Sequence, residues 1–268
     1  MTNRERYFDH LSRFGAVSGR LCEPFLNIVH ASPEAYLERS CKVSDDEVNP
    51  LRMNLWCRNT ENCNIVQYVD ELFLNYAKLT SLDLSLYHSV VGKGFCYDRV
   101  SYVVIGIDIR PRANASRLKV WYVVADYPEM EQVAFGMRGI SPKAAQLKVH
   151  RSFLFGFDFG LRGGAALKVY PVLHDYEIME NESLLLNMFG VGFIDMVKRC
   201  RRVSLGYSTA TENVTAHMVP YDTMAFVDAL NIPSLTNAYL ATGANNAIIA
   251  MSVEEIAASV CRNFNIYY

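Results

Sequence analysis

Three basic side chains, Arg52, Lys119 and Lys168, lie in segments with the composition of β-strands, and two of them have an aromatic partner. Trp121 follows Lys119 by two positions, and Tyr170 follows Lys168 in the same way. Residues i and i+2 of a strand share a face, so each base would sit beside a ring. Basic groups gathered inside a protein repel one another and need an anion, and arginine and lysine make charge-assisted bonds to phosphate oxygens. The pattern favours a diphosphate site bordered by aromatic rings.

Such a site would suit the breakdown of an allylic diphosphate. The bases, joined by His217, would hold the leaving group. Trp121 and Tyr170 would stabilise the allyl cation by cation–π attraction and exclude water. Glu38, in the first predicted strand, would take the proton from the attacking nucleophile.

Each of these residues also has a structural interpretation. Glu38 could pair with Arg39 or Lys42 on the surface, and the bases could lie on a solvated strand. The rings could belong to the core, and His217 could be a hydrogen-bonded structural histidine.

A repeat with a period near fifty residues organises these positions. Gly106, Gly156 and Gly206 are spaced by fifty residues, while Lys119, Lys168 and His217 are spaced by forty-nine. A period of this length indicates duplicated supersecondary units.

Each unit consists of a predicted β-hairpin followed by a helix. The predicted hairpins are 35–44 with 50–57, 100–109 with 117–126, 151–160 with 165–173, and 202–210 with 214–221. Two further strands are predicted at 246–253 and 262–268, and helices at 64–79, 127–139, 181–200 and 254–260. About ten antiparallel strands result, and closing them into a barrel removes the sheet edges. The fold class is therefore α+β, a closed antiparallel barrel surrounded by helices.

Alternation along the strands separates an apolar face from a polar one. The apolar face should pack under the amphipathic helices, so the polar face should line the middle of the barrel. We expect Gly106, Gly156 and Gly206 to keep that space open, and Gly206 with Ser204 to make room for a longer chain. An open sheet whose polar face meets solvent is the alternative.

Asp108 and Asp158 stand two positions after Gly106 and Gly156 and would lie on the polar face. They could accept hydrogen bonds from turns or brace the clamp lysines. If they instead faced the acceptor, three carboxylates with Glu38 would favour a cationic nucleophile such as an arginine side chain.

Composition limits the remaining possibilities. The chain has 268 residues, of which 51% are hydrophobic and 20% charged, and a formal net charge of −2. This charge argues against nucleic acid and an anionic membrane surface as partners. No signal peptide or spanning segment is recognisable, and seven scattered cysteines predict neither disulfides nor a zinc site, so a cytoplasmic protein is expected. No Pro- or Gly-rich linker interrupts the chain, which predicts a single domain over residues 1–268.

Three stretches, "GFDF…LKVYP", "IIAMSVEEI" before the last strand and the terminal "NFNIYY", occur in an order that resembles the ABBA prenyltransferases. The closest likeness is to the cyanobactin peptide prenyltransferases. The resemblance implies transfer of a prenyl group, usually dimethylallyl, from its diphosphate to a side chain or terminus of a small, often cyclic, ribosomal peptide. It also implies magnesium held through the diphosphate, without a DDxxD motif.

Carried over by position, the resemblance assigns one role to each residue on the polar face. Glu38 would be the base, Arg52, Lys119 and Lys168 the diphosphate clamp, and Trp121, Tyr170 and Tyr267 the cation shield. A non-catalytic barrel that binds a peptide or a phosphorylated small molecule is the alternative, and such a binder would need no base beside its anion.

Overall fold

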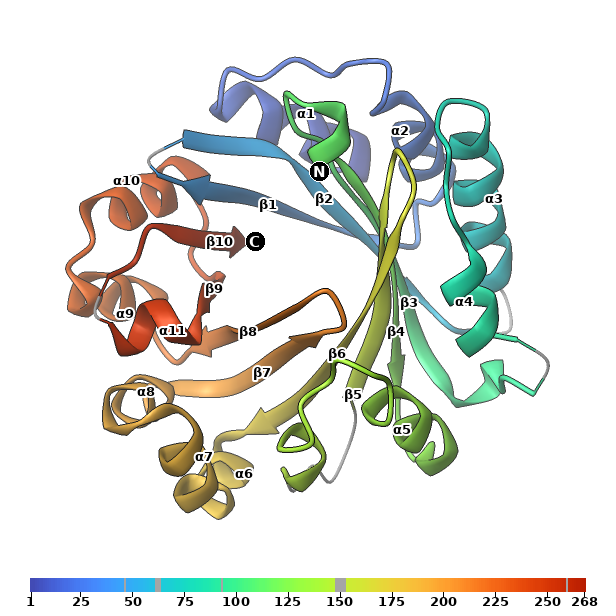
Figure 1. Ribbon diagram of the computed structural model, residues 1–268. Coiled ribbons are helices and arrows are strands. Elements are labelled where there is room, and N and C mark those ends of the chain that lie inside the picture. The colour runs from blue at the N-terminus through green and yellow to red at the C-terminus, as the bar shows by residue number, and fades with distance from the viewer. Residues whose placement is uncertain (46, 61–63, 93, 148–152, 259) are drawn as a thin grey trace. The chain divides into compact units, whose positions relative to one another are not determined.

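Ten β-strands form a closed antiparallel barrel in the computed structural model, which describes residues 1–45, 47–60, 64–92, 94–147, 153–258 and 260–268. Around the barrel the strands follow the order β1, β10, β9, β8, β7, β6, β5, β4, β3, β2 (Figure 1). Each strand therefore pairs with the next in sequence, and β10 closes the ring against β1. The fold class predicted from the sequence is confirmed.

The strands coincide closely with the β-branched and aromatic runs of the sequence. Their bounds are β1 (Tyr36–Ser44), β2 (Glu47–Arg58), β3 (Val100–Asp108), β4 (Arg117–Val124), β5 (Phe153–Gly160), β6 (Ala165–His174), β7 (Cys200–Ser208), β8 (Thr211–Pro220), β9 (Ile248–Ser252) and β10 (Asn263–Tyr267). The predicted strand at 151–160 begins with two residues that lie outside the described part of the chain.

Helices separate the hairpins, as the repeat predicts. Their bounds are α1 (Asn3–Arg13), α2 (Glu23–Ala31), α3 (Ile65–Ala77), α4 (Ser85–Val90), α5 (Pro128–Phe135), α6 (Asp175–Glu180), α7 (Glu182–Phe189), α8 (Val191–Val197), α9 (Thr223–Leu230), α10 (Pro233–Thr242) and α11 (Val253–Ala257). The helical stretch predicted at 181–200 is divided, because Gly190 adopts φ 84° between α7 and α8.

Two compact units make up the chain, and each is described by itself. The first comprises Met1–Ser40, Pro50–Ala134 and Leu154–Lys168, and the second comprises Cys41–Asn49, Phe135–Phe153 and Val169–Tyr268. The single domain expected from the sequence stays a prediction beside this division.

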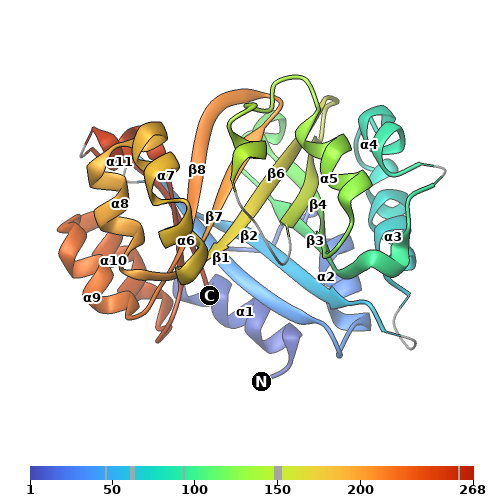
Figure 2. The same cartoon turned by 90° about the horizontal axis from the view of Figure 1, so that it is seen from below.

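In the first unit, α3 and α4 lie side by side against the outer face of the β3–β5 region (Figure 1, Figure 2). The ring of Phe73 in α3 meets Phe159 of β5 edge-on at 5.2 Å, and Tyr87 in α4 meets Phe157 in the same way. The hydroxyl of Tyr87 is hydrogen-bonded to that of Tyr122 in β4 at 2.8 Å. This aromatic layer fixes which face of the strands is turned toward the helices.

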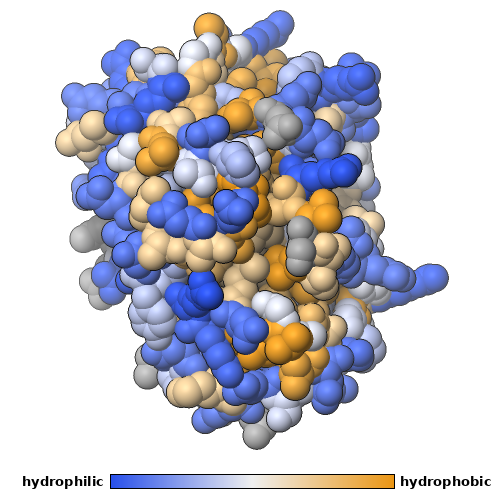
Figure 3. Space-filling model, turned by 90° about the vertical axis from the view of Figure 1, so that its left-hand side faces the viewer, coloured by the Kyte–Doolittle hydropathy of each residue, from blue (hydrophilic) through white to orange (hydrophobic). Residues whose placement is uncertain are grey.

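In the second unit, β7 pairs with β8, β8 with β9, and β9 with β10. Phe193 of α8 is fully buried, and α8 packs against α11. The face of the molecule that includes α9 and α10 carries hydrophobic side chains interspersed with hydrophilic ones (Figure 3). None of the helices in the described residues is both long and apolar enough to span a bilayer.

Candidate active site

Alternation in the first unit sorts side chains into the two predicted faces. Met53 and Leu55 of β2, and Leu118 and Val120 of β4, are fully buried. Tyr122, on the same face as Leu118 and Val120, is hydrogen-bonded to Tyr87 of α4, so this face lies under the helices. The predicted site residues between them belong to the opposite face, which is the inner face of a closed barrel. The predicted direction of the polar face is thus confirmed for these strands.

The three repeated glycines do not keep space empty, and this expectation was wrong. A Cβ atom on Gly106 would lie 2.4 Å from Oδ1 of Asn54, and one on Gly156 would lie 1.8 Å from Cδ1 of Trp121. These distances are much shorter than van der Waals contact, so the space above each glycine is filled by a side chain from the preceding strand. Glycine is needed because a neighbouring side chain occupies the place of a Cβ atom.

The same arrangement recurs in the second unit. A Cβ atom on Gly206 would lie 2.6 Å from Cε1 of Tyr170. Gly206 therefore seats the Tyr170 ring, and the expectation that it opens room for a longer chain loses its basis.

Asp108 is the centre of a buried ionic cluster at the end of β3. Its carboxylate lies 3.7 Å from Nη1 of Arg52 and 3.8 Å from Nζ of Lys119. Arg110 makes a two-point contact, with Nε 2.6 Å from Oδ1 and Nη2 donating to Oδ2 at 3.1 Å. Burial acts to raise the pKa of Asp108, but the charges of Arg52, Lys119 and Arg110 together hold it well below its usual range. Asp108 is therefore a carboxylate, and it is paired with Arg52, Lys119 and Arg110.

Asp158 on β5 forms a second cluster in the same unit. Its carboxylate lies 2.7 Å from Nζ of Lys168 and 3.6 Å from Nη1 of Arg117, and only 4% of the residue is exposed. Burial acts to raise the pKa of Asp158, but the charges of Lys168 and Lys119 outweigh it and lower the pKa. The prediction that these aspartates brace the clamp lysines is consistent with both clusters.

Arg110 and Arg117 are part of these clusters, although no site role was predicted for them. Arg110 lies two positions beyond Asp108 and just after the end of β3, and Arg117 is paired with Asp108 across the β3–β4 ladder. The i+2 spacing from Asp108 is a signal in the sequence that could have found Arg110.

Lys119 is the most perturbed base of the clamp. It is 2% exposed, and burial lowers its pKa to about 7, assisted by the charge of Arg52 and opposed by Asp108 and Asp158. Its ammonium group also lies 5.4 Å from the centroid of the Trp121 ring. A lysine in this setting gains most from an added anion, since an anion restores its charged form.

Glu38 on β1 is buried rather than paired with Arg39 on the surface. It is 7% exposed, and Nδ2 of Asn54 donates to its Oε2 at 2.7 Å. Burial raises the pKa of Glu38, while the hydrogen bond from Asn54 and the charges of Arg52 and Lys119 oppose the rise. A carboxyl group with a raised pKa is a stronger proton acceptor than an ordinary carboxylate.

An aromatic group occupies the inner face of the second unit. The ring of His217 in β8 lies 5.4 Å from that of Tyr170 in β6 and 5.6 Å from that of Tyr267 in β10. Tyr170 and Tyr267 are buried, while His217 is partly exposed. The three predicted residues Tyr170, His217 and Tyr267 thus gather with Gly206 in this unit, and the other predicted site residues gather in the first.

Charge defines what the first unit can bind. Five basic side chains contact two aspartates, which leaves an excess of positive charge even when Glu38 is ionised. The five are Arg52, Arg110, Arg117, Lys119 and Lys168. Arg52 and Lys119 are buried and Arg117 is exposed, so the excess positive charge extends from the interior to the surface. Such an excess calls for an anionic ligand with several oxygens.

The carboxylates of this region do not fit a magnesium site held by protein ligands. Asp108 and Asp158 are each engaged by basic side chains, which would repel a cation. Within the described ranges there is no cluster of three or more His, Cys, Asp or Glu side chains able to hold a metal.

Comparison with solved structures defines the class of fold. The 5-dimethylallyltryptophan synthase from Streptomyces coelicolor matches with a TM-score of 0.62 and 10% identity, over 99% of this chain and 97% of that one. The NotF prenyltransferase matches with a TM-score of 0.52 and 13% identity, over 100% of this chain and 95% of that one. A 6-dimethylallyl tryptophan synthase matches with a TM-score of 0.52 and 13% identity, over 86% of this chain and 80% of that one. The chain has the barrel fold of the ABBA prenyltransferases.

The sequence places the chain in a defined family. A family model described as a family of unknown function, DUF5838, matches residues 21–268, and the chain belongs to this family. None of the curated proteins compared with the chain matches it.

Proposed function

We propose that the chain is a prenyltransferase that moves a prenyl group from its diphosphate to a nucleophilic side chain of a small peptide. The observation that carries this proposal is the excess of positive charge around the buried Arg52 and Lys119, with Glu38 and Trp121 beside it. A binding protein for an anion would explain the charge alone. It would not explain a buried carboxyl group whose pKa is raised next to that charge.

The diphosphate would be held by Arg52, Lys119 and Lys168, with His217 as the further contact predicted from the sequence. Arg110 and Arg117 belong to the same ion pairs and extend the clamp. The bond between the prenyl carbon and the diphosphate oxygen breaks with its electron pair staying on the oxygen. Charge-assisted hydrogen bonds from the clamp stabilise the negative charge that develops there.

The allyl cation would be protected by Trp121, Tyr170 and Tyr267. Aromatic faces attract a cation and present no nucleophilic oxygen lone pair to it except at the tyrosine hydroxyls. The seats at Gly156 and Gly206 hold two of these rings flat against the strands. The nucleophile then forms its bond to the prenyl carbon, and Glu38 accepts the proton that the nucleophile releases.

The acceptor is proposed to be a peptide of the cyanobactin type, linear or cyclic, because of the resemblance of the sequence. Two of the similar structures are named as dimethylallyltryptophan synthases, so free tryptophan is the competing acceptor to test. An arginine acceptor required Asp108 and Asp158 to face it. Their contacts with basic side chains favour the bracing role instead.

Magnesium carried on the diphosphate remains a prediction from the resemblance. The chain offers the ion no ligand set of its own among the described residues. Bound to the diphosphate, magnesium would neutralise part of the leaving group's charge. Rates measured with magnesium and with EDTA give its share of that task.

The test is incubation with dimethylallyl or geranyl diphosphate and a panel of acceptors, followed by mass spectrometry. The panel contains linear and cyclic peptides with Tyr, Ser, Trp, His or Arg, together with free tryptophan. A mass gain of one prenyl unit on a peptide supports the proposal, and the gain on tryptophan alone would reassign the acceptor. Diphosphate binding without any product would favour the binding protein.

Glu38→Gln separates catalysis from binding in the same assay. We expect kcat to fall by about 10²–10⁴-fold, the usual contribution of a general base, while the donor still binds. Unchanged kcat in Glu38→Gln would remove the proposed base.

A further inference from the structure

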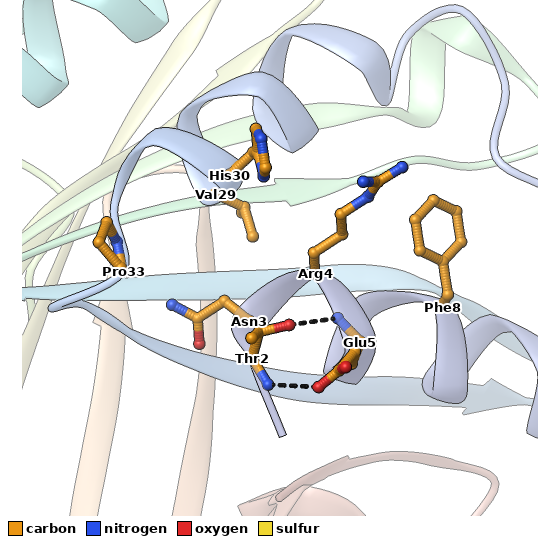
Figure 4. A pocket seen from close by; sticks show the side chains of 8 residues that line it. All are labelled: Thr2, Asn3, Arg4, Glu5, Phe8, Val29, His30 and Pro33. Atoms are coloured by element: carbon orange, nitrogen blue, oxygen red, sulfur yellow. Dashed lines mark hydrogen bonds between the residues drawn. The ribbon is translucent and has the colours of Figure 1, made fainter.

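Helix α1 packs on the outer face of β1 directly behind Glu38. Thr2 and Glu5 form a capping box that begins the helix and places Asn3 at its first position (Figure 4). Oδ1 of Asn3 accepts a hydrogen bond from the backbone N–H of Leu37 at 3.2 Å. Nδ2 of Asn3 donates to the carbonyl of Ala35 at 2.7 Å. One side chain of α1 therefore holds the backbone on the approach to Glu38.

A second contact holds β1 just beyond Glu38. The carboxylate of Asp9 lies 2.8 Å from Nη1 of Arg39. Asp9 is also paired with Arg13 one turn along the helix at 2.9 Å, which orients its carboxylate. Because successive side chains of a strand point to opposite faces, Leu37 and Arg39 reach α1 while Glu38 points away from it.

A third contact ties α1 to the start of β2. Nε2 of His10 donates to the carbonyl of Pro50 at 2.6 Å, and His10 is fully buried. Tyr7 and Leu11 are buried on the same side of the helix. Both strands that carry Glu38 and its partner Asn54 are thus anchored to one helix.

We propose that α1 is a positioning element for Glu38 and that Asn3 and Asp9 are positioning residues of the reaction. This inference rests on the proposed function. A base must come within hydrogen-bond distance of the proton that it accepts, and small misplacements of a catalytic group lower the rate strongly. The contacts of Asn3 and of Asp9 with β1 and the residue before it fix the backbone on either side of Glu38. Since α1 precedes residues 21–268, membership of the family does not imply these contacts.

Arg4, the neighbour of Asn3 in α1, supplies the control. A surface hollow of about 740 Å³ lies between α1 and α2, and Arg4 and Phe8 of α1 line it together with Val29 and His30 (Figure 4). The guanidinium of Arg4 lies 5.8 Å from the centroid of the Phe8 ring. Arg4 is exposed and belongs to the same helix turn as Asn3, but its side chain faces the hollow rather than β1.

The experiment compares Asn3→Asp and Asp9→Asn with Arg4→Ala in the full chain. Aspartate at the first position of a helix interacts favourably with the helix dipole and retains the acceptor for Leu37. Asn3→Asp replaces the donor to the carbonyls of Ala35 and Ser32 by an oxygen that repels them. We expect kcat to fall by about tenfold to a hundredfold in both variants, with the donor KM changed by less than about threefold. Arg4→Ala should keep both constants. Equal loss in all three variants, or a donor KM that rises as much as kcat falls, would overturn the proposal.

Hydrogen exchange provides a readout that does not depend on prenyl transfer. In the protein without substrate, peptides covering residues 35–40 should exchange faster in Asn3→Asp and Asp9→Asn than in Arg4→Ala. Unchanged exchange would refute the positioning role even if the chain is a prenyltransferase. If wild-type protein forms no product but exchange rises as expected, the proposed function fails while the grip of α1 on β1 stands.

Discussion

The two clamp lysines are predicted to respond oppositely when each is replaced by methionine. Lys119 is 2% exposed with a pKa of about 7, against an ordinary 10.5. This difference corresponds to about 4 kcal/mol of unfavourable free energy at neutral pH, because the unfolded chain binds a proton that the folded chain holds weakly. In Lys119→Met, Asp108 keeps Arg52 and Arg110 as partners. We expect the donor-free variant to be more stable than wild type by about 1–3 kcal/mol.

Lys168 is the matched control, since it lies at the equivalent position of the next repeat. Its ammonium lies 2.7 Å from the carboxylate of Asp158, which also lies 3.6 Å from Nη1 of Arg117. Lys168→Met therefore removes the nearest partner of a buried carboxylate. We expect a loss of about 3 kcal/mol of stability, the lower end for breaking a buried pair.

Donor binding should weaken in both variants, because each loses one charge-assisted bond worth about 1.5–3 kcal/mol, or about tenfold to a hundredfold in Kd. Urea denaturation gives the stabilities, and calorimetry with an unreactive diphosphate analogue gives the affinities. The advantage of Lys119→Met should shrink as pH rises from about 7 toward 10.5, where the wild-type lysine is neutral in both states. The reasoning is refuted if Lys119→Met is destabilised as much as Lys168→Met.

Three further variants test other parts of the site. In Gly156→Ala the added Cβ collides with Trp121, so we expect a lower Tm, altered tryptophan fluorescence and slower turnover. The second change Trp121→Ala should restore the Tm but not the turnover. Burial lowers the pKa of His10 from 6.5 to about 4, so stability should be lost as pH falls through this interval, by at most about 3 kcal/mol. In His10→Gln, denaturation curves recorded across this pH interval should differ less from one another than those of wild type. Asn54→Leu removes the hydrogen bond that lowers the pKa of Glu38, so the acid limb of the profile of kcat against pH should move to higher pH. An unmoved limb would contradict the assignment of Glu38 as the base.

Local patterns were sufficient to predict the barrel. The strands that carry Gly106, Gly156 and Gly206 show alternation and β-branched or aromatic composition, and the fifty-residue period repeats the hairpin. The same alternation gave the correct face for Lys119 and Lys168, because side-chain direction in a strand depends only on position.

Contacts between strands were the part that the sequence did not yield. The seat of Trp121 on Gly156 joins residues thirty-five positions apart, and nothing local distinguishes a glycine that seats a ring from one that leaves a hollow. Arg110 lies beyond the last residue of β3, and only its i+2 spacing from Asp108 relates it to the polar face. Helix α1 was not predicted either, and its grips on β1 depend on hydrogen bonds between separate segments.

The packing of a large side chain against a glycine of the next strand has a consequence for which substitutions such a barrel can accept. The large side chain and the glycine form one contact. Enlarging the glycine alone causes a collision, and shrinking the side chain alone leaves a void. A paired exchange, such as a smaller residue in place of Tyr170 with a larger one in place of Gly206, would shift side-chain volume from one strand to the next. The register of the strands would stay the same. The interior can thus be resculpted two residues at a time, while the hydrogen-bonded wall stays the same.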